Sequence, residues 1–215
     1  MKIAVILAEF GKPAPDVSQY RECWPDADIQ VFGDADVPRI PQFEGPRYGW
    51  RMNDYWTIRK ALESGADVAI PVDGDMWISD MTKMRTLPLL AQRFGICLPL
   101  NPRYTVQRDF EDGADVTGCV DQLLWQAPSV NCSPVAISLR DMRASLAHAY
   151  CEEILARPVR GPLAWWRAMG STGIAPLILP PQWCVCERHI GIGGEIMLHH
   201  GHASVKRHYG NLRIA

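Results

Sequence analysis

The first third of the chain alternates short apolar runs with segments of helical periodicity. Residues Lys2 to Ala8 form a continuous apolar run rich in branched side chains, which is typical of a strand buried on both faces. Similar strands are predicted at Asp28 to Phe32 and at Ala66 to Val72. Helical patterns separate these strands at Asp16 to Trp24 and from Gly49 to Ser64. The order strand, helix, strand, helix, strand favours a parallel sheet with crossover helices.

The remainder of the chain carries further patterns of both kinds. A length of 215 residues suits one domain with a substantial core. Asn101 to Thr117 is polar and acidic, and we expect it to be an active-site loop. We therefore predict a single α/β domain with a Rossmann-like, mixed, mainly parallel central sheet flanked by helices. The further elements we expect are helices at Ser79 to Phe94 and Arg140 to Leu155 and strands at Gly95 to Pro99, Pro134 to Leu139, Leu177 to Leu179 and Glu195 to Leu198.

The third predicted strand ends in two carboxylates, Asp73 and Asp75, separated by Gly74. Residues two apart in an extended segment point to the same side, so both carboxylates can reach one hard cation. In open parallel sheets, ligands bind beyond the carboxyl ends of the strands, which is where this motif falls. A surface turn is the alternative interpretation of an Asp-Gly-Asp sequence.

Imidazoles and an amine are concentrated near the other end of the chain, from Leu198 to Lys206. This segment reads Leu-His-His-Gly-His-Ala-Ser-Val-Lys. Together with the acidic motif, it suggests a divalent ion that holds a diphosphate. Such a centre predicts chemistry on a nucleotide-activated substrate.

Composition excludes several other classes of protein. Apolar residues make up 47% of the chain and charged residues 21%, as in ordinary globular proteins, and the formal charge of -2 gives no global attraction for nucleic acid. No stretch approaches the roughly 20 apolar residues that span a bilayer. The N-terminal apolar run lacks a convincing cleavage segment, so we expect a buried strand and a cytoplasmic location. The seven cysteines suit reduced thiols in that compartment.

The chain resembles glycosyltransferases of the GT-A fold, most closely the group that includes glycogenin and bacterial lipooligosaccharide galactosyltransferases. One stretch that carries the likeness is the acidic motif after the third strand. Another is Val130 to Ser138, which is similar to the family's Asn-containing strand beside the donor and acceptor. In the tail, the family places a metal-binding His six residues before a diphosphate-binding Lys, and His200 and Lys206 have that spacing.

The resemblance implies a sugar transfer from a nucleotide-diphosphate sugar, with UDP as the expected nucleotide, to a hydroxyl acceptor. Mn²⁺ or Mg²⁺ would be held by Asp73, Asp75 and His200, and the imidazole favours Mn²⁺. Whether His199 or His202 also binds the metal is left open. The residues that the resemblance implies in donor and cofactor binding are Ala8, Phe10, Arg51, Asn53, Asp73 and Lys206.

The acceptor half is less closely matched, because Pro134 stands where the family has Gly, and Asp121-Gln122 precedes the Asn-containing strand. Asn131, Asp109 and Asp121 are the residues we expect at the reacting centre, with either stereochemical outcome open. Glycan, metabolite and hydroxymethylated DNA all suit the predicted donor half as acceptors, and DNA is not favoured by the net charge. We divide the domain into a nucleotide-sugar half (residues 1–100), an acceptor half (101–198) and a tail closing over the diphosphate (199–215).

Two other functions are compatible with parts of the sequence. A nucleotidyltransferase of related topology would make the activated sugar, but its glycine-rich basic loop is poorly matched by the segment that follows Ala8. A non-enzymatic zinc module would join Cys184, Cys186 and His189 to a histidine of the tail. The Cys-x-Cys spacing is shorter than is usual for zinc ligands, and the acidic motif would be unexplained.

Overall fold

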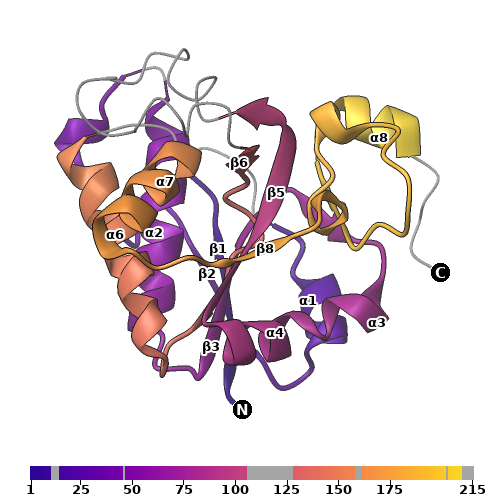
Figure 1. The fold of residues 1–215 in the computed structure, drawn as a ribbon, viewed down its shortest axis with the longest axis horizontal. Coiled ribbons are helices and arrows are strands. Elements are labelled where there is room, and N and C mark those ends of the chain that lie inside the picture. Colours follow the sequence, from indigo (N-terminus) through magenta and orange to yellow (C-terminus); the bar gives the residue numbers. More distant parts are fainter. Residues whose placement is uncertain (11–14, 46, 106–127, 158–160, 202, 210–215) are drawn as a thin grey trace.

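The computed structural model describes residues 1–10, 15–45, 47–105, 128–157, 161–201 and 203–209, which form one α/β unit (Figure 1). Within these ranges the predicted mixed, mainly parallel sheet flanked by helices is confirmed. In chain order the elements are β1 (Ile3–Ala8), α1 (Ser18–Cys23), β2 (Asp28–Phe32), the 3₁₀ helix η1 (Pro41–Phe43), α2 (Tyr48–Glu63), β3 (Val68–Asp73), β4 (Met76–Ile78), α3 (Met81–Met84), α4 (Leu87–Phe94), β5 (Ile96–Thr105), β6 (Pro128–Val130), β7 (Ala136–Ser138), η3 (Met142–Ala144), α6 (Ser145–Ala156), α7 (Gly161–Thr172), β8 (Leu177–Leu179), η4 (Pro181–Trp183), η5 (Glu187–His189), β9 (Leu198–His200) and α8 (Ala203–Tyr209).

The main sheet has the strand order β2-β1-β3-β7-β5-β6, with β8 beside β5. Strands β1, β2, β3, β5 and β8 run in one direction, and β7 and β6 run in the other. The register pairs Ala8 with Phe32 on one side and with Asp73 on the other. The first three strands therefore end level with one another, and Asp73 emerges at their common edge.

Helices cover both faces of the sheet because its strands are apolar on both sides. Along β1, Ala4 and Ile6 pack into the core under α2, α6 and α7, whereas Val5 and Leu7 pack into the core under α1, α3 and α4 (Figure 1). Side chains that alternate along a strand point to opposite faces. The continuous apolar run at residues 2–8 is thus explained by burial on two sides.

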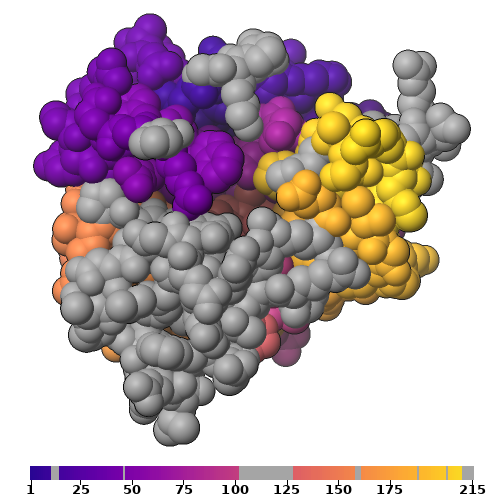
Figure 2. Space-filling view, turned by 90° about the horizontal axis from the view of Figure 1, so that it is seen from above, coloured from indigo at the N-terminus to yellow at the C-terminus, as the bar shows by residue number. Residues whose placement is uncertain are grey.

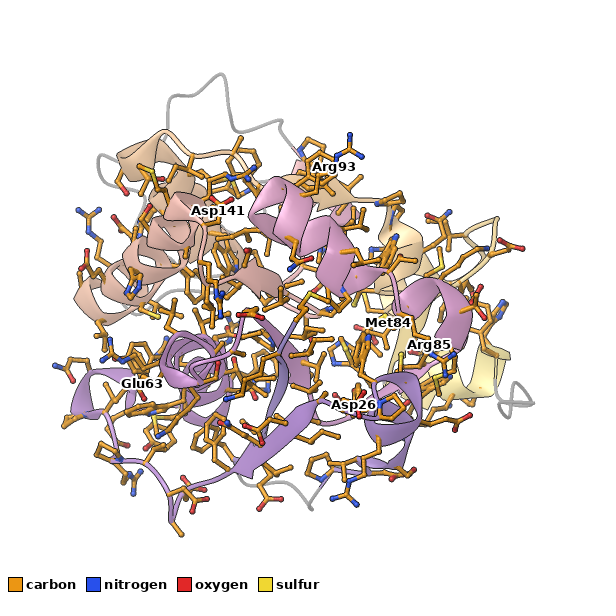
Figure 3. The ribbon with its side chains drawn as sticks, turned by 90° about the horizontal axis from the view of Figure 1, so that it is seen from below. Asp26, Glu63, Met84, Arg85, Arg93 and Asp141 are labelled. Atoms are coloured by element: carbon orange, nitrogen blue, oxygen red, sulfur yellow. The ribbon has the colours of Figure 1, made fainter. Side chains whose placement is uncertain are left out.

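On the second face, α1 is fastened to α3 through Arg85, which is labelled in the view from below (Figure 3). The Nε group of Arg85 donates to the carbonyl oxygen of Cys23 at 3.0 Å, and a terminal nitrogen donates to that of Glu22 at 3.1 Å. These carbonyls lie at the end of α1 and have no partner within that helix. Arg85 therefore caps α1 and holds it beneath β4.

Several elements differ from the sequence prediction. The single helix expected over 79–94 is two helices, because Asp80 caps α3 and Pro88 lies in the first turn of α4. Residues 101–105, expected within a loop, extend β5. The elements β4, β6, α7 and α8 were not predicted; β4 and β6 have three residues each, too few to carry a detectable period. Among the described residues, no helix combines the length and apolar character needed to cross a membrane.

Candidate metal centre

The acidic motif lies where β3 leaves the sheet and the chain turns into β4. Gly74 occupies the turn, and a Cβ atom at this position would lie 3.2 Å from the carbonyl oxygen of Ala8 and 3.2 Å from Pro15. Such separations are tighter than ordinary carbon contacts. The missing side chain therefore lets the turn pack against the end of β1, with Asp73 and Asp75 on either side of it.

Strand β9 brings His200 to the motif by pairing antiparallel with β4. The register places His200 opposite Met76, and its backbone N–H donates to the carbonyl of Val185 at 2.9 Å. The Nε2 atom of His200 lies 3.2 Å from Oδ1 of Asp75 and 3.7 Å from Oδ2 of Asp73. The sequence prediction that these three residues share a site thus agrees with their placement.

The donor set of Asp73, Asp75 and His200 suits one divalent ion. One ligand atom from each residue lies within 4.8 Å of the others, and all three side chains are half-buried. Opposite ligands of an ion bound at about 2.0–2.2 Å are separated by about 4.0–4.4 Å. The distances from His200 are shorter than this limit, and two carboxylates with one imidazole are ligands that Mn²⁺ accepts. The residues therefore fit a divalent metal.

Asp73 is held by side chains from two other parts of the chain. Asn53 on α2 donates through Nδ2 to Oδ1 of Asp73 at 2.9 Å. The hydroxyl of Ser133, in the turn between β6 and β7, accepts the backbone N–H of Asp73 at 2.8 Å and donates to Sδ of Met76 at 3.2 Å. Both the backbone and the carboxylate of Asp73 are thus fixed.

His199, which precedes the candidate metal ligand His200, is a fully buried ring rather than an exposed one. It stacks on Trp77 with ring centroids 4.8 Å apart and planes 7° apart, and its Nδ1 lies 2.5 Å from the hydroxyl of Ser79. Burial lowers the pKa of His199 to about 4, so the ring is neutral near pH 7. Its side chain supports the pairing of β4 with β9.

A cavity of about 350 Å³ lies between α1, the acidic turn and α8. Asp75 and Lys206 both line it. Its floor includes Gln19, whose side chain donates to the carbonyl of Met76 at 2.6 Å and accepts the N–H of Ile78 at 2.7 Å. Lys206, the residue predicted to bind the diphosphate, therefore lines the same cavity as the predicted metal ligand Asp75. Seen from above, the C-terminal segments (yellow) lie at the right of the view and the purple segments of the first third of the chain lie at the upper left (Figure 2).

Of the other residues predicted to contact the donor, Ala8 ends β1 and Phe10 follows it, whereas Arg51 lies on α2. Ala8 lies beside Asp73 in the sheet register. Phe10 is only 8% exposed and packs edge-on against Phe32, with ring centroids 5.9 Å apart, so it is a core residue in this arrangement. Arg51 points to η1, where its guanidinium donates to the carbonyl of Phe43 at 3.4 Å.

Of the residues predicted for the reacting centre, only Asn131 lies within the described part of the chain. Asn131 donates through Nδ2 to Sγ of Cys184 at 3.1 Å, and its Oδ1 accepts the N–H of Cys132 at 3.2 Å. Asn131 thus links the turn between β6 and β7 to Cys184. Asp109 and Asp121 lie outside the described residues, and so does His202.

Cys184, Cys186 and His189 do not form a group of metal-binding atoms in the described part of the chain. Nδ1 of His189 lies 2.9 Å from the carbonyl oxygen of Cys184, and Nε2 lies 3.1 Å from Oδ1 of Asn101. Burial raises the pKa of the Cys184 thiol well above its usual value, which disfavours the thiolate that zinc requires. The geometry therefore gives no support to a zinc module built on these residues.

Sequence reasoning missed Ser133 and Gln19 as supports of the site. Ser133 lies within the Val130 to Ser138 segment that resembles the glycosyltransferase strand. The sequence therefore indicated this segment as part of the site, but it did not indicate the hydrogen bond of Ser133 to Asp73. Gln19 is buried beneath β4 and carries no motif. Both act through contacts more than fifty residues away in sequence, which local patterns do not encode.

No protein-family model matches the sequence, and no curated protein matches it. Several solved structures are similar to this one. A glycosyltransferase involved in the glycosylation of the major capsid of PBCV-1 is similar with a TM-score of 0.55 at 9% identity, over 98% of each chain. The apo form of mouse xyloside xylosyltransferase 1 aligns over 94% of this chain and 86% of that chain, with a TM-score of 0.49 at 13% identity. The chain therefore shares the fold of the first of these enzymes.

Proposed function

We propose that this protein is a metal-dependent glycosyltransferase that moves a sugar from a nucleotide-diphosphate sugar to a hydroxyl acceptor. The observation that carries the proposal is the convergence of Asp73, Asp75 and His200 at the carboxyl edge of the parallel strands. This edge is the ligand-binding position of open α/β sheets. The fold shared with a solved glycosyltransferase supports the same assignment.

Within this function, the departing diphosphate develops negative charge that the protein has to stabilise. A divalent ion held by the two aspartates and His200 would supply Lewis-acid stabilisation of both phosphates. The ammonium group of Lys206, which lines the cavity beside Asp75, is suited to contact the distal phosphate. The spacing of His200 and Lys206 supports the resemblance to the glycogenin-like group, and UDP is the nucleotide that this resemblance implies.

The acceptor in this proposal is a hydroxyl of a glycan, a metabolite or a hydroxymethylated base. A net charge of -2 does not favour DNA, and a salt-sensitive mobility shift with duplex DNA would argue for it. Asn131, Asp109 and Asp121 stay proposals for the reacting centre. Their substitution should lower turnover without lowering metal-dependent nucleotide binding.

The test is calorimetric titration with UDP, with and without Mn²⁺, followed by GDP. Wild-type protein should bind UDP only with the metal, and Asp75→Ala and His200→Ala should each abolish this binding, because each removes one of three protein ligands. Asp26→Ala is a matched control, since this exposed carboxylate lies after α1 on the side seen from below (Figure 3). Full binding in either ligand variant, or no binding of either nucleotide to the wild type, would contradict the proposal.

A further inference from the structure

The hydrogen bond between Asn53 and Asp73 divides the two oxygens of one carboxylate between different tasks. Oδ1 of Asp73 accepts the Asn53 amide at 2.9 Å, whereas Oδ2 is the oxygen that faces Nε2 of His200 at 3.7 Å. The carboxylate is therefore turned so that one oxygen lies among the metal-ligand atoms and the other lies against α2.

An aspartate carboxylate does not choose such an orientation by itself. Its terminal torsion is broad, so the plane of the carboxylate, and with it the direction in which each oxygen points, varies in the absence of a partner. The backbone of Asp73 is already fixed, because its N–H donates to the buried hydroxyl of Ser133. The remaining freedom lies in the carboxylate, and that is the group that Asn53 contacts.

Asn53 is itself held firmly enough to direct another side chain. It lies within α2 beside Met52, which is fully buried in the core. The whole helix packs against β1 and β3, the strands whose ends carry the site. This packing places the backbone of Asn53 beside the end of β3, from where its amide reaches Asp73.

We propose that Asn53 is a positioning residue, which orients Asp73 so that Oδ2 is available to the metal. This role is distinct from the donor-binding role that the resemblance implies, since the contact that the structure shows is the donation of one of the two amide N–H groups to Asp73. The inference rests on the metal centre of the proposed function. Outer contacts of this kind orient metal ligands elsewhere in proteins, and their removal lowers metal affinity by about 10–100-fold.

The experiment measures Mn²⁺ affinity by the loss of the free-ion paramagnetic resonance signal, with and without UDP. Asn53→Ala and Asn53→Leu should each weaken Mn²⁺ binding by about 10–100-fold, and the second variant keeps the volume of the side chain. Thr57→Ala is the matched control, since it removes a buried hydrogen bond of the same helix without contacting Asp73. It should bind Mn²⁺ as the wild type does, even where its melting temperature falls as far as that of the Asn53 variants.

Wild-type affinity in the foldable Asn53 variants would overturn the inference, and so would an equal loss in Thr57→Ala, which would indicate a general weakening of the helix. Weaker Mn²⁺ binding in the Asn53 variants, with no effect of UDP on the wild type, would support the inference while contradicting the glycosyltransferase. Absence of Mn²⁺ binding to the wild type under both conditions would overturn both proposals.

Discussion

Substituting Gly201 with alanine should damage the metal centre without altering any of its ligands. A Cβ atom at this position would lie 2.9 Å from Cβ of Asp75 and 3.1 Å from its carbonyl carbon, and it would overlap the carbonyl oxygen. Carbon atoms in contact prefer about 3.5–4.0 Å, so the backbone has to move apart by about 0.5–1 Å. Because His200 is the preceding residue, this movement separates its imidazole from Asp75.

The strain of such overpacking is typically about 1–3 kcal/mol. If all of this strain is relieved when the metal is lost, it lowers the metal affinity by about 5–150-fold. We would measure Mn²⁺ affinity by calorimetry and stability by urea denaturation, with Gly193→Ala as the control, since a Cβ atom there has no neighbour within 4 Å. A Gly201→Ala protein with both wild-type affinity and wild-type stability would refute the reasoning.

Two further predictions concern stability. Trp165 is fully buried, so Trp165→Ala should lower the free energy of unfolding by about 3–5 kcal/mol in urea denaturation, whereas Trp50→Ala, at a side chain 62% exposed, should change it little; equal losses would contradict this. Hydrogen bonds from Arg143 lower the pKa of Asp141 from 3.8 to about 2. A lowered carboxyl pKa contributes stability that is present above pH 3.8 and is lost as the pH falls toward 2. Asp141→Asn should therefore flatten the dependence of the free energy of unfolding on pH between about pH 4 and 2. A dependence as steep as that of the wild type would count against this.

Sequence reasoning was most successful where burial on both faces of the sheet leaves a strong pattern. The strands β1, β2 and β3 and the helix α2 were predicted nearly to their ends, and Gly65 ends α2 with the positive φ of 64° expected after a helix. The helix α7 was missed because it begins with Gly161 and Pro162 and is rich in tryptophan. Proline is accepted in the first turn of a helix, and that signal was overlooked.

The candidate site was partly predictable for a different reason. Asp73 and Asp75 follow a recognisable strand, and the spacing of His200 and Lys206 resembles a known tail. The contacts that arrange these groups are between residues distant in sequence. The pairing of β4 with β9 and the amide of Asn53 on Asp73 depend on how helices and strands pack, and no local period or motif encodes them.

The pairing of β4 with β9 also has a consequence for biosynthesis. The two carboxylates leave the ribosome before the imidazole of His200, which completes the candidate ligand set. A nascent chain that has folded its first three strands would present the acidic turn but not the third ligand. Prematurely terminated chains that lack β9 should therefore be unable to compete with the finished protein for metal, even where their sheet has formed.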